Sequence, residues 1–189
     1  MNHKALIASM TLTMLAPTSM VAAHSSTAFL AQSANNTSQP ETTAAPIRNI
    51  KEWDLSKKSL AIDGYDPVAY FPEGGSKPTK GKKSITLTYK GVNYRFASAA
   101  NREAFEKNPS KYEPAFGGWC AWAMSKGTKT EINPKTYIIK DDRLYLFYNG
   151  LFGNTKDDWE KGNHASLSDQ ADAEWKTISG ESPRLPTNP

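Results

Sequence analysis

Apolar and polar residues alternate along residues 84–89. Such alternation is typical of a strand that has one buried face. The dipeptide Lys90-Gly91 follows as a turn signal, and residues 92–97 then continue with the same alternation. The pattern predicts a β-hairpin over residues 84–97.

A second hairpin is predicted from residues 136–139 and 144–147, with Asp141-Asp142 between the strands. Two shorter strands are predicted before the first hairpin, over residues 59–62 and 68–71. Glycine and proline residues follow each of these short strands, as they do where a strand ends in a turn.

Between and after the two hairpins, the sequence predicts helices. Ser98 is a good N-cap for a helix that continues to about Lys107, because Pro109 then ends it. Further helices are predicted from Gly117-Gly118 to Gly127, over residues 157–161, and over residues 168–178 with Ser168 as the cap. The elements together predict an α+β fold: a small single domain with two β-hairpins packed against several short helices.

The first 49 residues differ in composition from this domain. Residues 1–23 carry one basic residue, an apolar run and a small-residue end, a pattern typical of a cleaved signal peptide. Residues 24–49 are polar and poor in charge, which predicts a disordered linker. The domain is therefore expected over residues 50–179, followed by a flexible, proline-rich tail over 180–189. The expected location is periplasmic or secreted, without stable membrane insertion after the leader is cleaved.

The charge and the cysteine content restrict the expected partners and the expected source of stability. Without the leader the chain has 22 basic and 19 acidic residues, or +3, because Lys4 is the one charged residue lost from the full count of 23 and 19. Basic and acidic residues are interspersed, so nucleic acid is not an expected partner. A single cysteine, Cys120, excludes an internal disulfide, so stability must come from buried apolar surface, much of it aromatic.

Several segments of the domain carry a more specific signal. They are Asp66-Pro67-Val68-Ala69-Tyr70, the Tyr94-Arg95-Phe96 of the second predicted strand, Gly117-Gly118-Trp119-Cys120-Ala121, Leu144-Tyr145-Leu146 and Ala171-Asp172-Ala173-Glu174-Trp175. Together they resemble the YHS domain family, and in particular its exported members. The resemblance implies an accessory protein associated with heavy metals, and it supplies no catalytic residue.

Metal-associated members of that family carry cysteine at three positions that are Ala69, Ala97 and Asn101 here. Because thiolates are the ligands that hold soft metals, this chain keeps the expected scaffold without its usual metal ligands.

Cys120 is the strongest candidate for chemistry of its own. It is expected in the first turn of a helix, where free backbone amides stabilise a thiolate. Met124 follows one turn later, and a thiolate beside a thioether is a pair that copper(I) prefers. His164, in an expected loop before the last helix, is the third candidate ligand of this metal site. The plainer alternative is that Cys120 is a small buried residue between Trp119 and Trp122.

Other chemistry has weaker support. Aspartates are frequent, but their positions are those of turn formers and helix caps, and no spacing matches a calcium loop. They are Asp63, Asp66, Asp141, Asp142, Asp157 and Asp158. The sequence contains no nucleophile elbow, phosphate loop or zinc-protease motif.

Three hypotheses follow. The first is an exported, non-enzymatic accessory protein that binds copper or another soft metal through Cys120, Met124 and His164. The second is a thiol-dependent redox protein or enzyme that uses Cys120. The third is a structural or interaction module of the cell envelope whose aromatic surface docks on a partner.

Overall fold

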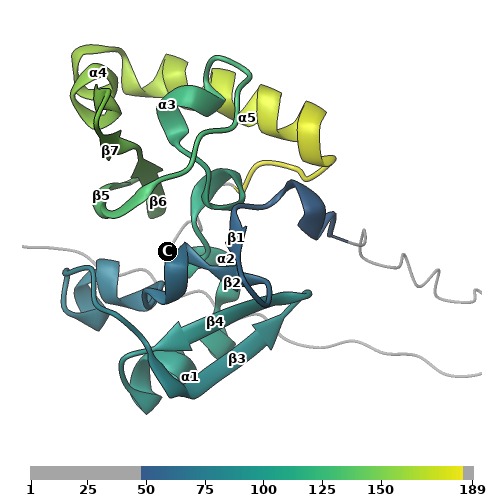
Figure 1. Cartoon of the computed structure of the whole chain (residues 1–189), viewed down its shortest axis with the longest axis vertical. Helices are drawn as coiled ribbons and strands as arrows, with labels where there is room; N and C mark the ends of the chain where they lie inside the picture. Colours follow the sequence, from purple (N-terminus) through teal and green to yellow (C-terminus); the bar gives the residue numbers. More distant parts are fainter. Residues whose placement is uncertain (1–47, 185–189) are drawn as a thin grey trace, which may run out of the picture. The chain divides into compact units, whose positions relative to one another are not determined.

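The computed structural model describes residues 48–184 (Figure 1). The predicted signal peptide, all but the last two residues of the predicted linker, and the final five residues lie outside this range. The described residues have the predicted α+β composition.

The first sheet has four strands in the order β1-β2-β4-β3. They are β1 (Leu55–Ser56), β2 (Leu60–Ala61), β3 (Lys82–Tyr89) and β4 (Val92–Phe96). β3 and β4 form the first predicted hairpin, with an irregularity between Lys82 and Thr86. β2 pairs with β4 in parallel, so the short segment before the hairpin becomes part of the same sheet.

The second hairpin consists of β5 (Asn133–Lys140) and β6 (Arg143–Phe147), and it is confirmed as predicted. Asp141 and Asp142 form its turn, both in the left-handed region at φ of 51° and 53°. A third, unpredicted hairpin follows from β7 (Asn149–Gly150) and β8 (Gly153–Asn154).

Five α-helices accompany the sheets in the described part of the chain. They are α1 (Ala99–Lys107), α2 (Pro109–Tyr112), α3 (Ala121–Met124), α4 (Thr155–Lys161) and α5 (His164–Ser179). Figure 1 shows α1 beside β3 and β4, whereas α3, α4 and α5 gather around β5 and β6. The predicted cap of α1 is confirmed, since the Ser98 hydroxyl accepts a hydrogen bond from the amide of Asn101.

Single-turn 3₁₀ helices make up much of the remaining chain. They are η1 (Ile50–Glu52), η2 (Ile62–Gly64), η3 (Val68–Tyr70), η4 (Pro72–Gly74) and η5 (Ala115–Gly118). The prediction of a strand over 68–71 is therefore wrong. Pro67 has helical dihedral angles, and the Asp66 carboxylate accepts a hydrogen bond from the Val68 amide at 2.8 Å, so the segment turns instead of extending.

The last helix also begins earlier than predicted. Asn163 caps α5 by accepting a hydrogen bond from the Ser166 amide at 3.0 Å, so His164 is the first helical residue and does not lie in a loop. Ser168 is buried inside the helix and is not its cap. A full turn of helix is gained because Asn163 is an equally good capping residue placed earlier in the chain.

The interior is filled largely by rings, as the composition predicts. Its largest fully buried side chains are Trp159, Tyr70, Tyr94, Tyr145, Phe71, Phe96, Phe105, Phe116, Phe147, Met124, Leu144 and Leu146. One cluster includes residues of the four-stranded sheet, of β6 and of α1, α3, α4 and α5. The domain is therefore held together by a single aromatic core.

Candidate functional site

Cys120 lies inside the core, with no exposed surface. It is the residue before α3 and has non-helical dihedral angles, so it does not occupy the helical turn in which it was expected. Its backbone amide donates to the carbonyl of Thr130 at 3.0 Å, and its carbonyl accepts from the amide of Met124. Hydrogen bonds thus fix the backbone amide and the backbone carbonyl of Cys120.

The sulfur has one polar neighbour, the hydroxyl of Thr155, at 3.2 Å. That hydroxyl also lies 3.1 Å from the carbonyl of Tyr148, which can only accept. Because the Thr155 proton is used on the carbonyl, the sulfur must act as the donor to the Thr155 oxygen. The Cys120 side chain is therefore tied to Thr155 by a hydrogen bond in which the sulfur is the donor.

The other two candidate ligands have packing roles in this structure. Met124 is fully buried in the aromatic core. The Nδ1 atom of His164 accepts a hydrogen bond from the indole nitrogen of Trp159 at 2.9 Å, and its ring stands edge-on to Tyr145 and Trp159. Burial lowers the pKa of His164 and outweighs the nearby carboxylate of Asp141.

Within residues 48–184, no three His, Cys, Asp or Glu side chains are grouped as they would be around a metal ion. A metal held by Cys120, Met124 and His164 would require the sulfur to lose its proton and the imidazole to leave the Trp159 hydrogen bond. The soft-metal site stays a prediction.

The buried thiol leads to a prediction about reactivity. We expect Cys120 in the folded protein to react with iodoacetamide at least about 100-fold more slowly than in the urea-unfolded chain, because reaction requires the structure to open. Mass spectrometry of timed samples measures both rates. Equal rates in the two states would contradict the buried placement and would favour the redox hypothesis.

Three positions singled out in the sequence, Ala69, Ala97 and Asn101, all hydrogen-bond to one buried residue, Asp66. The Ala69 amide donates to the Asp66 carbonyl at 3.2 Å, and the Ala97 amide donates to its carboxylate at 2.7 Å. The side-chain amide of Asn101 donates to the same oxygen at 2.7 Å. Asp66 has no exposed surface. In this chain these positions form a closed hydrogen-bond network that joins η3, the end of β4 and α1.

A polar cavity of about 150 Å³ lies beside β1, where Asp54, Asp63 and Glu131 converge. The pKa of Asp54 is raised to about 7, because burial disfavours its charged form and because Glu131 and Asp63 add like charge. Sequence reasoning treated Asp63 as a turn former and did not single out Asp54 or Glu131. The three are separated in the chain and only the fold brings them together.

This carboxyl group makes stability depend on pH. Between about 3.9, where an unfolded aspartate titrates, and about 7 the folded protein holds a proton that the unfolded chain has lost. The free energy of unfolding should therefore fall as the pH rises through that window. We expect Asp54→Asn to become more stable relative to the wild type between pH of about 4 and about 8, as measured by urea denaturation. A stability difference that does not change with pH would contradict the raised pKa, and Glu103→Gln, at an exposed position of α1, serves as the control.

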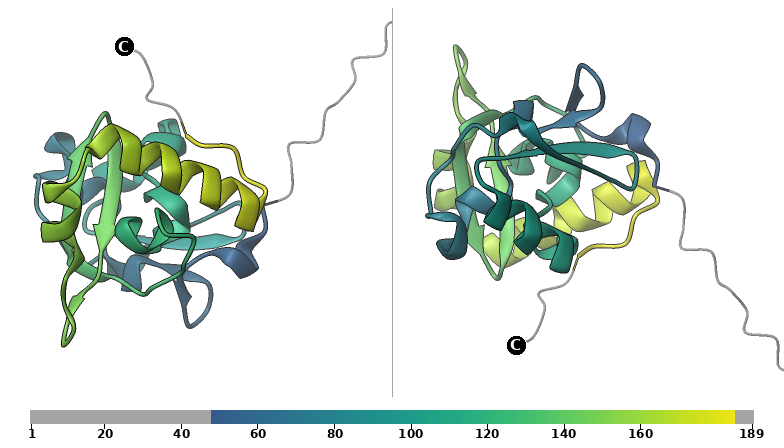
Figure 2. Two further views of the ribbon diagram at one scale, coloured as in Figure 1. Left: turned by 90° about the horizontal axis from the view of Figure 1, so that it is seen from above. Right: turned by 90° about the horizontal axis from the view of Figure 1, so that it is seen from below.

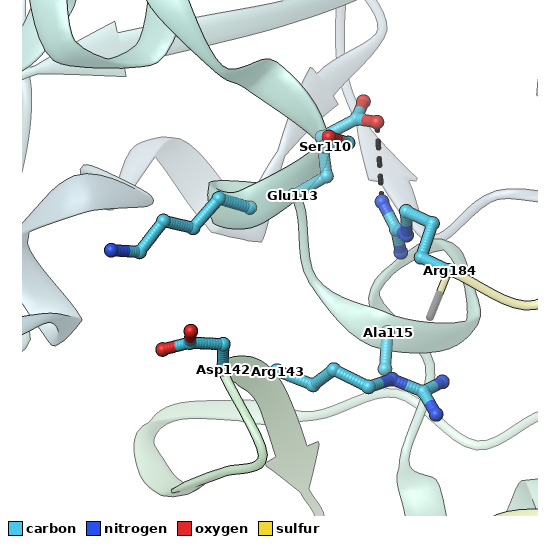
Figure 3. A pocket seen from close by; sticks show the side chains of 7 residues that line it. Ser110, Glu113, Ala115, Asp142, Arg143 and Arg184 are labelled. Atoms are coloured by element: carbon cyan, nitrogen blue, oxygen red, sulfur yellow. Dashed lines mark hydrogen bonds and ion pairs between the residues drawn. The ribbon is translucent and has the colours of Figure 1, made fainter. Parts of the chain in front are cut away.

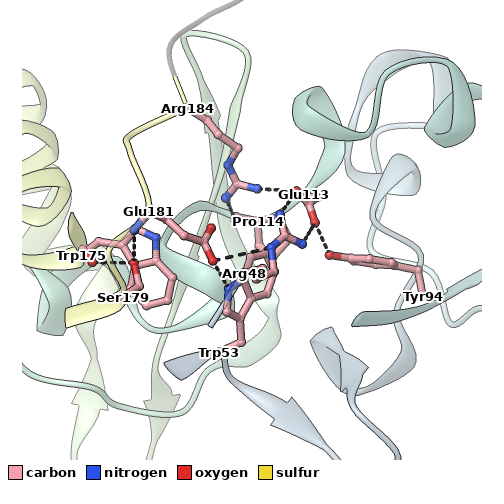
Figure 4. Close-up of polar contacts among 9 residues, drawn as sticks. All are labelled: Arg48, Trp53, Tyr94, Glu113, Pro114, Trp175, Ser179, Glu181 and Arg184. Atoms are coloured by element: carbon pink, nitrogen blue, oxygen red, sulfur yellow. Dashed lines mark hydrogen bonds and ion pairs between the residues drawn. The ribbon is translucent and has the colours of Figure 1, made fainter. Parts of the chain in front are cut away.

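A second carboxylate, that of Glu113, joins the two ends of the described chain (Figure 4). Arg48 donates to both of its oxygens, at 2.6 and 2.9 Å, and Arg184 donates to one of them at 3.1 Å. The buried hydroxyl of Tyr94 donates to it as well. Arg184 also contacts the Pro114 carbonyl, and Glu181 accepts from the Trp53 indole. The contacts of the domain thus extend to Arg48 and Arg184, beyond the predicted bounds of 50 and 179.

Two hollows adjoin this clasp formed by Arg48, Glu113 and Arg184. The smaller, between α2 and β6, has a volume of only about 10 Å³, too little for an organic ligand (Figure 3). The larger is a groove of about 350 Å³ lined by Arg48, Tyr89, Lys90, Ser110, Glu113, Ser179, Gly180, Glu181, Ser182 and Arg184. The arginines that line this groove are already paired with Glu113. We therefore attribute the clasp to the stability of the fold, and we do not assign it a ligand.

The most exposed apolar side chains lie at the tip of the third hairpin. Leu151 is 92% exposed and Phe152 is 91% exposed, and they are the large hydrophobic residues found at the surface of the described domain. They are adjacent and sit between β7 and β8. Figure 2 shows this hairpin projecting from the rest of the domain in both views. This exposed apolar pair is the candidate binding surface of the described domain.

Polar contacts hold this tip in place. The Tyr148 hydroxyl accepts a hydrogen bond from the Phe152 amide at 3.3 Å. A Cβ atom at Gly150 would lie 2.6 Å from that hydroxyl, so a larger residue there would displace the Tyr148 side chain. At the base, the side chain of Asn149 donates to Thr136, and that of Asn154 donates to Asp157 at 2.8 Å. The tip is thus presented by an ordered support.

Sequence reasoning did not single out Leu151 or Phe152. The usable signal was the segment Asn149-Gly150-Leu151-Phe152-Gly153-Asn154, in which turn formers flank two large apolar residues on both sides. Such flanks predict a tight hairpin, and the two residues at its centre could not then reach a core.

In the described part of the chain, no helix combines the length and apolar character needed to cross a bilayer. Comparison with protein-family models, with curated proteins and with solved structures found no match.

Proposed function

We propose that this chain is an exported accessory domain of the YHS type that binds a protein partner, and that the β7–β8 hairpin inserts Leu151 and Phe152 into an apolar recess of that partner. Export and family rest on residues 1–23 and on the sequence resemblance. The observation that carries the binding function is the nearly complete exposure of both side chains on an ordered support. The proposal thus develops the interaction-module hypothesis.

The two side chains at the tip can make a large contribution to the binding free energy. Burying a leucine or phenylalanine side chain contributes about 1.5–3 kcal/mol each, so the pair contributes about 3–6 kcal/mol. That corresponds to a factor of about 100 or more in the dissociation constant. Because the hairpin is already ordered, little of this energy is lost in fixing its conformation.

A protein partner fits the surroundings of the tip better than a lipid surface. The residues that flank the apolar pair are two glycines and two asparagines, without a lysine or arginine among them. Anionic lipid would be attracted by basic residues near the apolar tip. Polar amides beside two apolar anchors instead resemble the rim and centre of a protein interface.

Site-specific crosslinking tests the proposal. A photoreactive amino acid at Phe152 should give a defined crosslinked product in cells of the native host, whereas the same group at Lys57, an exposed turn residue, should not. The double variant Leu151→Ser, Phe152→Ser should weaken binding to the crosslinked partner by about 100-fold or more.

Two outcomes would overturn this function. One is equal crosslinking at Phe152 and Lys57. The other is cosedimentation with vesicles of phosphatidylcholine and phosphatidylglycerol that the double variant loses, since the hairpin would then be a membrane anchor. Circular dichroism of the double variant should match the wild type, because neither side chain belongs to the core.

A further inference from the structure

The outer face of the first sheet is polar and open to solvent. Residues directly opposite each other in the β3–β4 hairpin share a face, so Thr86 lies beside Arg95, and Thr88 lies beside Asn93. The Thr88 hydroxyl donates to the side chain of Asn93, which places both on the same side. Thr86 and Thr88 are exposed, and Asn93 and Arg95 are partly exposed. The opposite face of the hairpin packs against Phe105 of α1.

The corresponding face of the second hairpin is buried. Both hairpins have the same register, including an irregularity in which the first strand advances by four residues while the second advances by one. In that register Leu144 and Leu146 of β6 occupy the places of Asn93 and Arg95, and they are 0% and 1% exposed. The first hairpin therefore presents to solvent a face that its counterpart packs into the core.

The sequence around this open face is basic. Residues 74–102, which include β3 and β4, contain seven basic residues and no aspartate or glutamate. The seven are Lys77, Lys80, Lys82, Lys83, Lys90, Arg95 and Arg102. Lys57 and Lys58, in the turn between β1 and β2, add two more, and the Lys58 carbonyl accepts a hydrogen bond from the Asn93 side chain. The general interspersion of basic and acidic residues does not extend to this segment.

Most of these charges are not neutralised within the domain. Among the described residues, no carboxylate forms an ion pair with five of the basic groups near this face: Lys57, Lys58, Lys82, Lys83 and Arg95. The four lysines of this set are exposed. An acidic residue beside them is Asp63, whose carbonyl accepts a hydrogen bond from Lys80 at 3.1 Å. The positive charge around the open face is therefore available to an external partner.

Acidic residues gather at the other end of the domain. Residues 141–181, which include α4 and α5, contain nine acidic and four basic residues. Figure 1 shows these two helices at the end of the domain opposite to β3 and β4. This separation of charge orients the first sheet toward a negatively charged surface.

We propose that the outer face of the first sheet binds the anionic headgroups of a phospholipid bilayer, with the surrounding lysines at the lipid phosphates. Each lysine or arginine near an anionic bilayer strengthens binding by about fivefold, so several acting together hold a protein at the surface. The residues paired across the open face are threonine, asparagine and arginine. They provide no aromatic ring to stack on a base and no large apolar anchor for a protein partner. The choice of lipid over nucleic acid also rests on the proposed export, but not on the role of the hairpin tip.

Cosedimentation of the mature chain, residues 24–189, with lipid vesicles tests the proposal. We expect binding in low salt to vesicles of equal parts phosphatidylcholine and phosphatidylglycerol, a steep loss of binding in high salt, and none to phosphatidylcholine alone. The double variant Lys82→Glu, Lys83→Glu should weaken binding by about tenfold or more, because two attractive charges become repulsive. The matched control is Lys135→Glu, Lys140→Glu, which changes the net charge equally at two exposed residues of β5.

Each outcome decides the proposal. Binding that needs phosphatidylglycerol, that the β3 variant weakens and that the β5 variant changes by less than about twofold supports it. It is overturned if the anionic vesicles are not bound in low salt, if the two lysine pairs weaken binding equally, or if the protein binds duplex DNA but not the vesicles. Lys82 and Lys83 are exposed, so their double variant should fold.

The same assay separates this proposal from the proposed function. The variant Leu151→Ser, Phe152→Ser should bind the anionic vesicles as the wild type does. Loss of vesicle binding in that variant would move the lipid contact to the hairpin tip and would overturn both proposals. Equal crosslinking at Phe152 and Lys57, with vesicle binding as expected, would overturn the role of the tip alone.

Discussion

Asp66→Ala should cost about 4 kcal/mol or more of unfolding free energy, because two buried donors and one partly buried donor would lose their carboxylate acceptor. These donors come from η3, from the residue after β4 and from α1, so the loss affects three elements at once. Small domains are stable by only about 5–15 kcal/mol, so the variant should lose a large fraction of the total stability. Urea denaturation followed by tryptophan fluorescence measures the change.

Two comparisons make the Asp66 result specific. Glu103→Ala removes an exposed carboxylate from α1 and should change stability by no more than about 0.5 kcal/mol. Asp66→Asn keeps the shape but turns one oxygen into a donor, so it should also be strongly destabilising. A loss below about 1 kcal/mol for the alanine variant would show that the network does not hold these elements together.

Glu113→Ala should destabilise the domain by about 3–5 kcal/mol, because it removes the bidentate partner of the buried Arg48 guanidinium and leaves it only the Glu181 carboxylate, at 3.5 Å. Burial raises the pKa of Glu113, but Arg184, Arg48 and the Tyr94 hydroxyl together lower it below its usual value. The contribution of Glu113 is therefore present above the pKa of about 4.3 of an unfolded glutamate, and it is lost as the pH falls below that value.

Thermal unfolding of Glu113→Ala near neutral pH gives the size of the effect. Arg184→Met serves as the comparison, because Arg184 is more exposed than Arg48 and its loss leaves Arg48 paired. We expect a clearly smaller effect for Arg184→Met. If Glu113→Ala and Arg184→Met are equally destabilising, the clasp depends on the C-terminal segment more than on the buried pair.

Local sequence patterns predicted the regular elements well. The alternation in β3 and β4, the turn at Asp141-Asp142 and the Ser98 cap are each set by residues within a few positions of one another. Errors occurred where a distant or equally good local partner intervened. Asp66 turned an expected strand into a 3₁₀ helix, and Asn163 capped the last helix before Ser168 could.

The candidate sites were harder to predict for a related reason. Cys120 and Met124 attracted attention by residue type, but type does not reveal burial, and the fold places both in the core. Conversely, Leu151 and Phe152 are of residue types that usually lie in a core, but both are exposed at the tip of the third hairpin. Asp54 and Glu131 line one cavity although they are distant in the chain.

The sequence by itself determined the fold class, the two main hairpins, the first helix cap and an interior built from rings. It could do so because turn formers, caps and alternating apolar residues act over short distances along the chain. Only the tertiary structure decided that the thiol is sealed, that His164 carries an unpartnered N–H beside Asp141 and that Leu151 and Phe152 are exposed. Whether a side chain is buried, and which groups it contacts, depends on residues that are distant in the chain. A local sequence pattern contains no information about those residues.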